Sequence, residues 1–145
     1  MLTSMSLATL AAREPAVEVK FAGFQNQTRL SPYFHAADLL VLPSRASETW
    51  GLVVNEALMH GLSAVVSDRV GCGPDLVVPG LTGEVFPSDS IAGLAAALRR
   101  AISRRGQADV REACRERAAR FSVHAAAVGI AAAVRAAMLP SGGGA

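Results

Sequence analysis

Two glutamates that flank a glycine are the residues of this chain whose types and spacing could do chemistry. Glu48 and Glu56 stand eight positions apart, and Gly51 lies between them. The apolar run at 39–42 precedes them and is broken by Pro43. This order predicts a buried strand, a loop and then a helix, and ligands of α/β proteins bind at the carboxyl ends of such strands.

The chemistry that these residues offer is anion binding beside sugar hydroxyls. A helix that begins near Gly51 leaves its first backbone amides without intrahelical acceptors, and together with the helix dipole they attract an anion, most often a phosphate. Gly51 has no side chain, so the anion can approach the backbone closely. Glu56 would lie roughly 7 Å along the axis, at ~1.5 Å per residue, where its carboxylate could accept bonds from ribose hydroxyls. Glu48 precedes the helix and could accept a bond from a sugar hydroxyl or stabilise developing positive charge.

The same glutamates also fit a plainer interpretation. Both could be solvated acids at the start of a helix, where the dipole favours negative charge. Their spacing alone does not choose between a ligand site and an ordinary helix start.

Five ordered motifs carry a resemblance to a known family. The segment from Glu48 to Glu56 resembles the E-x7-E motif of family-four retaining glycosyltransferases, which have the two-domain GT-B fold. The other motifs resemble that family's "F-x-G-F", "AAD-x-x-x-x-PS", "EA-x-x-x-G-x-P-V-V", and "E-I/L-V" followed by "G-x-x-G". They lie at 21–24, 36–44, 55–67, 75–77 and 80–83. The resemblance covers residues 17–86 and extends more weakly to about 121.

The resemblance implies transfer of a glycosyl unit from a nucleoside diphosphate sugar to an acceptor, with retention of configuration. By position, Glu48 would be the catalytic residue that faces the donor sugar, and Glu56 would bind the ribose hydroxyls. The backbone at Trp50, Gly51 and Leu52 would hold the diphosphate. No cofactor and no metal are implied, because the helix N-terminus and basic side chains stabilise the leaving diphosphate in this family.

Three positions near the implied donor site keep a plainer alternative. Gln25 falls where the family contacts the base through its backbone, and it equally fits an ordinary loop residue. Trp50 fits packing better than stacking on a base, because the motif places it beside the phosphates. Asp75 stands where the family often has Glu near the donor, and it could equally cap a short helical piece.

The resemblance maps residues 1–139 to the second, donor-binding domain of the GT-B fold and leaves 140–145 as a disordered tail. The family's acceptor-binding first domain, and the first strand of the second domain with its basic "R-x-x-x-x-K" region, are expected to be missing. The alternative is therefore an inactive nucleotide-binding fragment. A GT-B nucleotide-sugar epimerase is a third interpretation, and the glutamate pair argues against it. A missing strand would also expose a sheet edge, which favours marginal stability or self-association.

Length and composition exclude several other functions. A chain of 145 residues with 51% hydrophobic residues supports one domain with a real core. The formal charge of +2 is too small to argue for nucleic-acid binding, and the late arginines alternate with Glu112 and Glu116 as on a solvated helix face.

The cysteines and histidines indicate no catalytic thiol and no metal site. Cys72 and Cys114 lie far apart without a CxxC pattern, so we expect free buried thiols, and the three histidines lack zinc spacing. No signal-peptide pattern follows Met1, and the apolar run at 125–139 is too short to span a bilayer and contains Arg135. The expected location is cytoplasmic, with peripheral membrane contact if the acceptor is a lipid.

Apolar periodicity and turn residues predict the elements that must position the site. Strands that alternate with helices predict a Rossmann-like α/β fold, a parallel sheet with helices on both faces. Strands are expected at 17–22, 39–42, 64–66 and 83–86, and helices at 2–12, 28–37, 51–60, 75–77, 90–102, 109–121 and from 123 onward.

Overall fold

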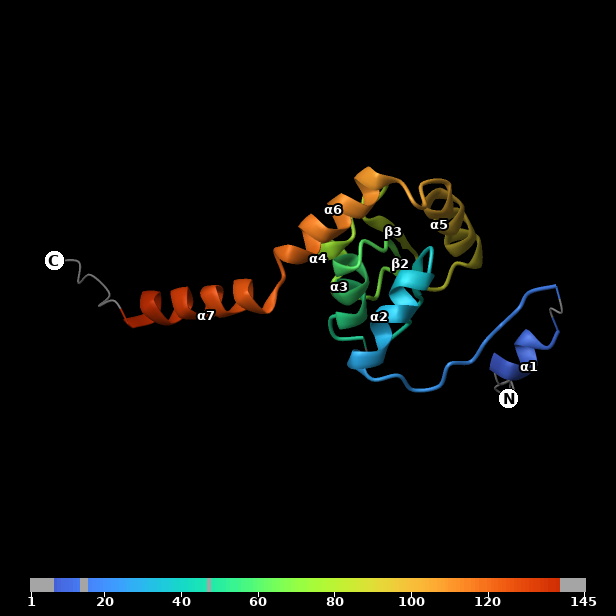
Figure 1. Cartoon of the computed structure of the whole chain (residues 1–145), viewed down its shortest axis with the longest axis horizontal. Helices are drawn as coiled ribbons and strands as arrows, with labels where there is room; N and C mark the ends of the chain where they lie inside the picture. The colour runs from blue at the N-terminus through green and yellow to red at the C-terminus, as the bar shows by residue number, and fades with distance from the viewer. Residues whose placement is uncertain (1–6, 14–15, 47, 139–145) are drawn as a thin grey trace. The chain divides into compact units, whose positions relative to one another are not determined.

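The computed structural model describes residues 7–13, 16–46 and 48–138. The chain divides into two compact units, Met1–Leu30 and Ser31–Ala145. The first unit contains helix α1 (Leu7–Ala11), and helix α2 (Gln27–Ala36) begins in it and continues into the second unit. All other helices and strands described below belong to the second unit (Figure 1). The predicted tail at 140–145 lies outside the described residues.

A parallel three-stranded sheet forms the centre of the second unit. Its strands are β1 (Leu40–Leu42), β2 (Ala64–Ser67) and β3 (Gly83–Phe86), in the spatial order β1-β2-β3. All four residues of β2 are buried, as expected of a central parallel strand covered on both faces. The three predicted strands in this unit are confirmed, within one residue at each end.

Helices cover both faces of this sheet, which confirms the predicted α/β fold class (Figure 1). Helix α5 (Ile91–Ser103) packs on one face, where its Ala97 and Ala101 meet Val65 and Phe86. Helices α3 (Leu52–Met59), α4 (Gly73–Leu76) and α6 (Ala108–Ala119) pack on the other face. Successive residues of β2 therefore point alternately into two separate apolar clusters.

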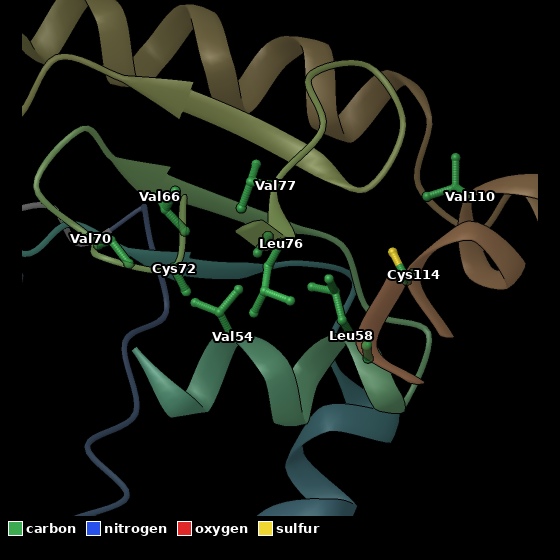
Figure 2. Close-up of a cluster of buried hydrophobic side chains, with 11 residues drawn as sticks. Val54, Leu58, Val66, Val70, Cys72, Leu76, Val77, Val110 and Cys114 are labelled. Carbon is green, nitrogen blue, oxygen red and sulfur yellow. The ribbon is translucent and has the colours of Figure 1, made fainter. Parts of the chain in front are cut away.

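The larger cluster lies beneath the helix that carries the glutamate motif. Figure 2 shows Val54 and Leu58 of α3 pointing toward Val66 of the sheet and Leu76 of α4, with Cys114 of α6 closing one end. Val54, Leu58 and Leu76 are fully buried, so packing against this cluster holds α3 in place. Such burial contributes about 1.5–3 kcal/mol per large aliphatic side chain.

Local sequence signals set the ends of several helices. Ser90 caps α5, because its side-chain oxygen accepts a bond of 2.9 Å from the amide of Gly93. Gly61 ends α3 with a φ of 75°, which favours glycine. Ser122 caps α7 (Val123–Met138) through a bond of 3.1 Å from the amide of Ala125. All three helix ends lie within one residue of the bounds predicted from the sequence.

Helix α7 contains no buried residue. The stretch Ala108–Met138 is apolar and long enough to cross a membrane by length and composition, with a mean hydropathy of 1.5 in its best window. The chain leaves the helical conformation at 120–122, between α6 and α7. Helix α7 alone is about 24 Å long at ~1.5 Å per residue, short of the ~30 Å of a bilayer core. This one stretch is weak evidence for a membrane span.

One prediction in the amino-terminal region is wrong. Residues 17–22 form no strand, and Val17 and Phe21 are both 60% exposed. Alternating residues give a strand only where a neighbouring strand accepts its amides, and the described residues contain no strand paired with this segment. The helix predicted at 28–37 is confirmed within one residue at each end, and Pro32 lies in the interior of α2.

Candidate functional site

The glutamate motif lies at the carboxyl-terminal edge of the parallel sheet. Strand β1 ends at Leu42, and the loop that follows it leads into α3 at Leu52. Strand β2 ends at Ser67, and its loop leads to α4 through Cys72. Because parallel strands end at the same edge, the two loops meet there, as expected of a ligand site in an α/β sheet.

Gly51 is the residue that turns the first loop into α3. Its φ of 99° and ψ of 55° lie in the left-handed region, which disfavours any residue with a side chain. A Cβ at this position would also lie 3.0 Å from Cγ1 of Val70 and 3.2 Å from the sulfur of Cys72. The backbone conformation and the crowded surroundings therefore both require glycine.

The amino end of α3 carries no side-chain cap. Gly51 provides no side-chain capping hydrogen bond. The first intrahelical bond runs from the amide of Val54 to the carbonyl oxygen of Gly51 at 2.9 Å. The amides of Leu52 and Val53 therefore have no intrahelical acceptor, and the positive end of the helix dipole adds to them. This helix start can hold an anion through its backbone.

The two loops are joined by backbone contacts around this helix start. The amide of Cys72 donates to the carbonyl oxygen of Trp50 at 2.6 Å, and the thiol donates to the carbonyl oxygen of Gly51 at 3.6 Å. Gly71 passes so close to Thr49 that a Cβ on Gly71 would collide with the Thr49 carbonyl oxygen. The backbone at 49–51 is thus held in place by the second loop.

The thiol of Cys72 is buried beside the start of α3. The pKa of its thiol is raised to about 11, mainly by burial and in smaller part by the nearby carboxylates of Glu48 and Asp75. The thiol is fully buried and protonated at neutral pH, so it is a packing group and a weak donor, not a nucleophile. Its free, buried state was predicted, and so was that of Cys114.

The structure places five of the six predicted site residues on one continuous segment. Glu48 and Trp50 are half-buried, Gly51 is buried, and Glu56 is half-buried on the second turn of α3. Leu52 is 57% exposed. These placements do not assign roles to the residues, and their donor-binding roles stay predictions.

Gln25 belongs to the other unit. Its side-chain amide donates a bond of 2.6 Å to the carbonyl oxygen of Ala22, within the same loop. This local bond leaves the backbone contact that the resemblance implies for Gln25 as a prediction.

Sequence reasoning missed the contacts that hold Trp50. Its indole nitrogen donates to a carboxylate oxygen of Asp75 at 3.4 Å, and its ring lies 6.1 Å from the ring of Phe121. Trp50 therefore packs against protein, as the sequence suggested, but with partners 25 and 71 positions away. Only the turn-rich run 71–75 marks this second loop in the sequence, and nothing there indicates Phe121.

Two hollows lie at this edge of the sheet. One, of about 330 Å³, is lined by residues that include Pro43, Arg45 and Phe86, and Arg45 forms an ion pair with Asp89 beside it. The other, of about 300 Å³, lies between the end of β2 and α4 and is mostly apolar. Neither is lined by Glu48 or Glu56. Glu48 and Glu56 therefore lie outside both hollows, and both are half-buried.

Comparison with known proteins identifies the family. The sequence profile of "Glycosyl transferases group 1" matches residues 6–121. The chain belongs to this glycosyltransferase family. Its α/β sheet also superimposes on the sucrose-phosphate synthase of Thermosynechococcus elongatus with a TM-score of 0.75 and 27% identity, over 88% of this chain and 32% of that one.

Curated relatives are similar over part of their length. A D-inositol 3-phosphate glycosyltransferase 2 of Catenulispora acidiphila is 38% identical over 120 residues, which is 78% of this chain and 26% of the relative. The lipopolysaccharide 1,2-N-acetylglucosaminetransferase of Salmonella typhimurium is 34% identical over 56% of this chain and 22% of its own length. A glycogen synthase of Mycobacterium tuberculosis is 41% identical over 55% of this chain and 19% of its own. The chain thus spans about a quarter or less of these relatives.

Proposed function

We propose that this chain is the donor-binding domain of a family-four retaining glycosyltransferase and holds a nucleoside diphosphate sugar at the start of α3. The observation that carries the proposal is the uncapped, left-handed Gly51 with Glu48 before it and Glu56 after it. An anion on the amides of Leu52 and Val53 would lie between these two carboxylates. This arrangement suits a diphosphate with a sugar at each end.

The proposed reaction moves the glycosyl group from the donor to an acceptor hydroxyl. The bond between the anomeric carbon and the diphosphate oxygen breaks, and a bond to the acceptor oxygen forms on the same face of the sugar. The amides at the start of α3 stabilise the charge that develops on the leaving diphosphate, so the proposal includes no resident metal. Glu48 would bind a donor-sugar hydroxyl or stabilise positive charge at the anomeric carbon, and Glu56 would hold the ribose.

The acceptor side of the reaction would come from outside the described segment. Glu48 and Glu56 are half-buried, and a partner domain would close over them, as in the GT-B arrangement. Such a domain would supply the acceptor site and basic groups for the diphosphate. We place the reaction in the cytoplasm, and a lipid acceptor would bring it to a membrane surface.

Calorimetric titration of the whole chain with UDP, GDP and ADP tests this proposal. We expect one of the three to bind, and Glu56→Ala to weaken that binding by about 1.5–3 kcal/mol, the range for a hydrogen bond to a charged group. Glu116→Ala is the matched control, because Glu116 is an exposed glutamate on α6. Equal affinity in the Glu56 and Glu116 variants would refute the assigned role of Glu56, and no binding of any nucleotide by the folded chain would refute the donor site.

A further inference from the structure

The carboxyl end of α6 contacts the proposed donor-binding loop from the side. Arg117 donates through Nε to the backbone carbonyl oxygen of Asp75 at 2.5 Å, and its guanidinium lies 6.0 Å from the centre of the Phe121 ring. The Phe121 ring in turn lies 6.1 Å from the ring of Trp50. Trp50 donates to the carboxylate of Asp75 at 3.4 Å, which closes a ring of four residues.

This four-residue ring, formed by Trp50, Asp75, Arg117 and Phe121, touches both loops of the site. Trp50 immediately precedes Gly51, so the orientation of its ring is coupled to the backbone that begins α3. Asp75 lies on α4 directly after the loop that contains Cys72. A displacement at the end of α6 would therefore reach the backbone amides of α3 through packed and hydrogen-bonded groups.

A fifth residue ties α3 itself to the same place. Asn55 is 6% exposed, and its side-chain amide donates to the carbonyl oxygen of Phe121 at 3.2 Å. Its other polar atom, Oδ1, is buried without a hydrogen-bond partner in the described part of the chain. A buried unpaired oxygen costs stability, so a residue chosen for stability alone would not carry it. This mismatch is the kind of local conflict that positioning a site can explain.

We propose that the end of α6 sets the geometry of the donor-binding loop, with Arg117 and Phe121 as positioning residues that act through Trp50 and Asp75. The inference rests on the proposed function, because the geometry it sets is that of the amides proposed to hold the diphosphate. Neither residue touches the donor. Their effect is to hold the Trp50–Gly51 backbone in the conformation that aims those amides outward.

This inference can be tested without any ligand, because Trp50 is the only tryptophan of the chain and its fluorescence can be followed alone. Quenching of its fluorescence by acrylamide measures how tightly the ring is held. We expect Arg117→Ala to make Trp50 more accessible to acrylamide than it is in the wild type. Arg120→Ala is the matched control, since Arg120 is an exposed arginine one turn along and outside the ring of contacts.

Two further measurements separate positioning from simple destabilisation. Hydrogen exchange of the amides at 51–54 should speed up in Arg117→Ala at unchanged melting temperature. Nucleotide affinity should fall about three- to tenfold, within the range for residues that modulate a site without touching the ligand. Phe121→Leu keeps an apolar side chain at this position, and it replaces Phe121→Ala in these measurements if that variant does not fold. It should restore a folded chain with an intermediate loss of affinity.

The outcomes distinguish this inference from the proposed function. If Arg117→Ala and Phe121→Leu match Arg120→Ala in quenching and in exchange at 51–54, the end of α6 does not position the loop and the inference is overturned. If quenching and exchange change as expected but the wild type binds none of UDP, GDP and ADP, the proposed function fails and the link between α6 and the loop stands. Changed quenching with unchanged nucleotide affinity would overturn the positioning role.

Discussion

The backbone amide of Cys72 donates a hydrogen bond of 2.6 Å to the carbonyl oxygen of Trp50. This bond joins the loop after β1 to the loop after β2 directly beside Gly51, where α3 begins. The donor-binding surface that we propose is therefore made by two loops from neighbouring parallel strands, which are joined directly by a backbone hydrogen bond. Substitutions that alter the backbone there should have larger effects than substitutions of nearby polar side chains.

Replacing Gly51 by alanine should destabilise the fold. The φ of 99° disfavours a side chain, and the new Cβ would press on Val70 and Cys72. We expect a loss of about 1–3 kcal/mol in the free energy of unfolding, measured by urea denaturation. Gly129→Ala is the control, because Gly129 lies inside α7 and a Cβ there would meet no atom within 4 Å. It should be neutral or stabilise by about 0.5–1 kcal/mol. Equal effects of the two substitutions would contradict this account of Gly51.

Arg100 should matter more than its neighbour Arg99. The Glu84 side chain is 7% exposed, and its Oε2 accepts a bond of 2.9 Å from Nε of Arg100. Arg100→Ala would leave a buried carboxylate whose remaining hydrogen-bond donor, among the described residues, is the amide of Gly80 at 3.1 Å. We expect a loss of about 1–3 kcal/mol in urea denaturation. Arg99 is exposed, so Arg99→Ala should change stability by no more than about 0.5 kcal/mol. A larger effect at Arg99 would show that the pair is not what stabilises this region.

The two thiols should be unreactive in the folded chain and should make it less stable in alkali. Burial raises the pKa of both Cys72 and Cys114 from 9.0 to about 11. A pKa raised on folding means that the folded chain keeps its protons longer than the unfolded chain. The thiols' contribution is therefore complete below pH 9 and is lost as pH rises toward about 11.

Two measurements check the thiol prediction. A thiol-specific disulfide reagent at pH 8 should modify neither cysteine until the chain unfolds. Unfolding free energies measured between pH 8 and pH 11 should fall with pH, and Cys72→Ala combined with Cys114→Ala should make the slope shallower. Rapid modification of the native chain, or a slope that the double substitution leaves unchanged, would contradict the assigned burial.

The edge of the sheet at β1 should promote self-association. The amide of Leu40 bonds to the carbonyl oxygen of Ser63 on the β2 side, so the backbone groups of Val41 face the other way. Val41 is also 38% exposed on this edge strand. We expect Val41→Lys to lower the sedimentation-measured association constant, because a charge on an edge strand opposes pairing between chains. Val123→Lys adds the same charge to the first residue of α7 and should leave the constant unchanged. Association that is indifferent to Val41→Lys would locate the contact elsewhere.

Local signals predicted much of the fold, and long-range packing decided what they missed. Strand β3 was predicted at its observed bounds, and Ser90, Gly61 and Ser122 end or begin helices as their side chains or conformations require. The segment 17–22 has the right alternation and is no strand, because pairing requires a neighbour that the pattern cannot supply.

The candidate site shows the same division. Glu48, Gly51 and Glu56 lie close together in the sequence, so their place in one candidate site could be predicted from spacing and family resemblance. The contacts of Trp50 with Phe121, and of Asp75 with Arg117, join residues 42 or more positions apart. No local period records such contacts, because they arise only when α6 packs beside α3.

The most direct test of the central claim is the response of individual backbone amides to a nucleotide. In ¹⁵N-edited NMR spectra of the whole chain titrated with UDP, GDP and ADP, the amides of Gly51, Leu52 and Val53 should shift the most with at least one nucleotide. Inorganic pyrophosphate should shift the same amides, because the diphosphate is what they bind. Nucleotide binding that shifts amides elsewhere and leaves residues 51–53 unchanged would contradict a donor site at the start of α3.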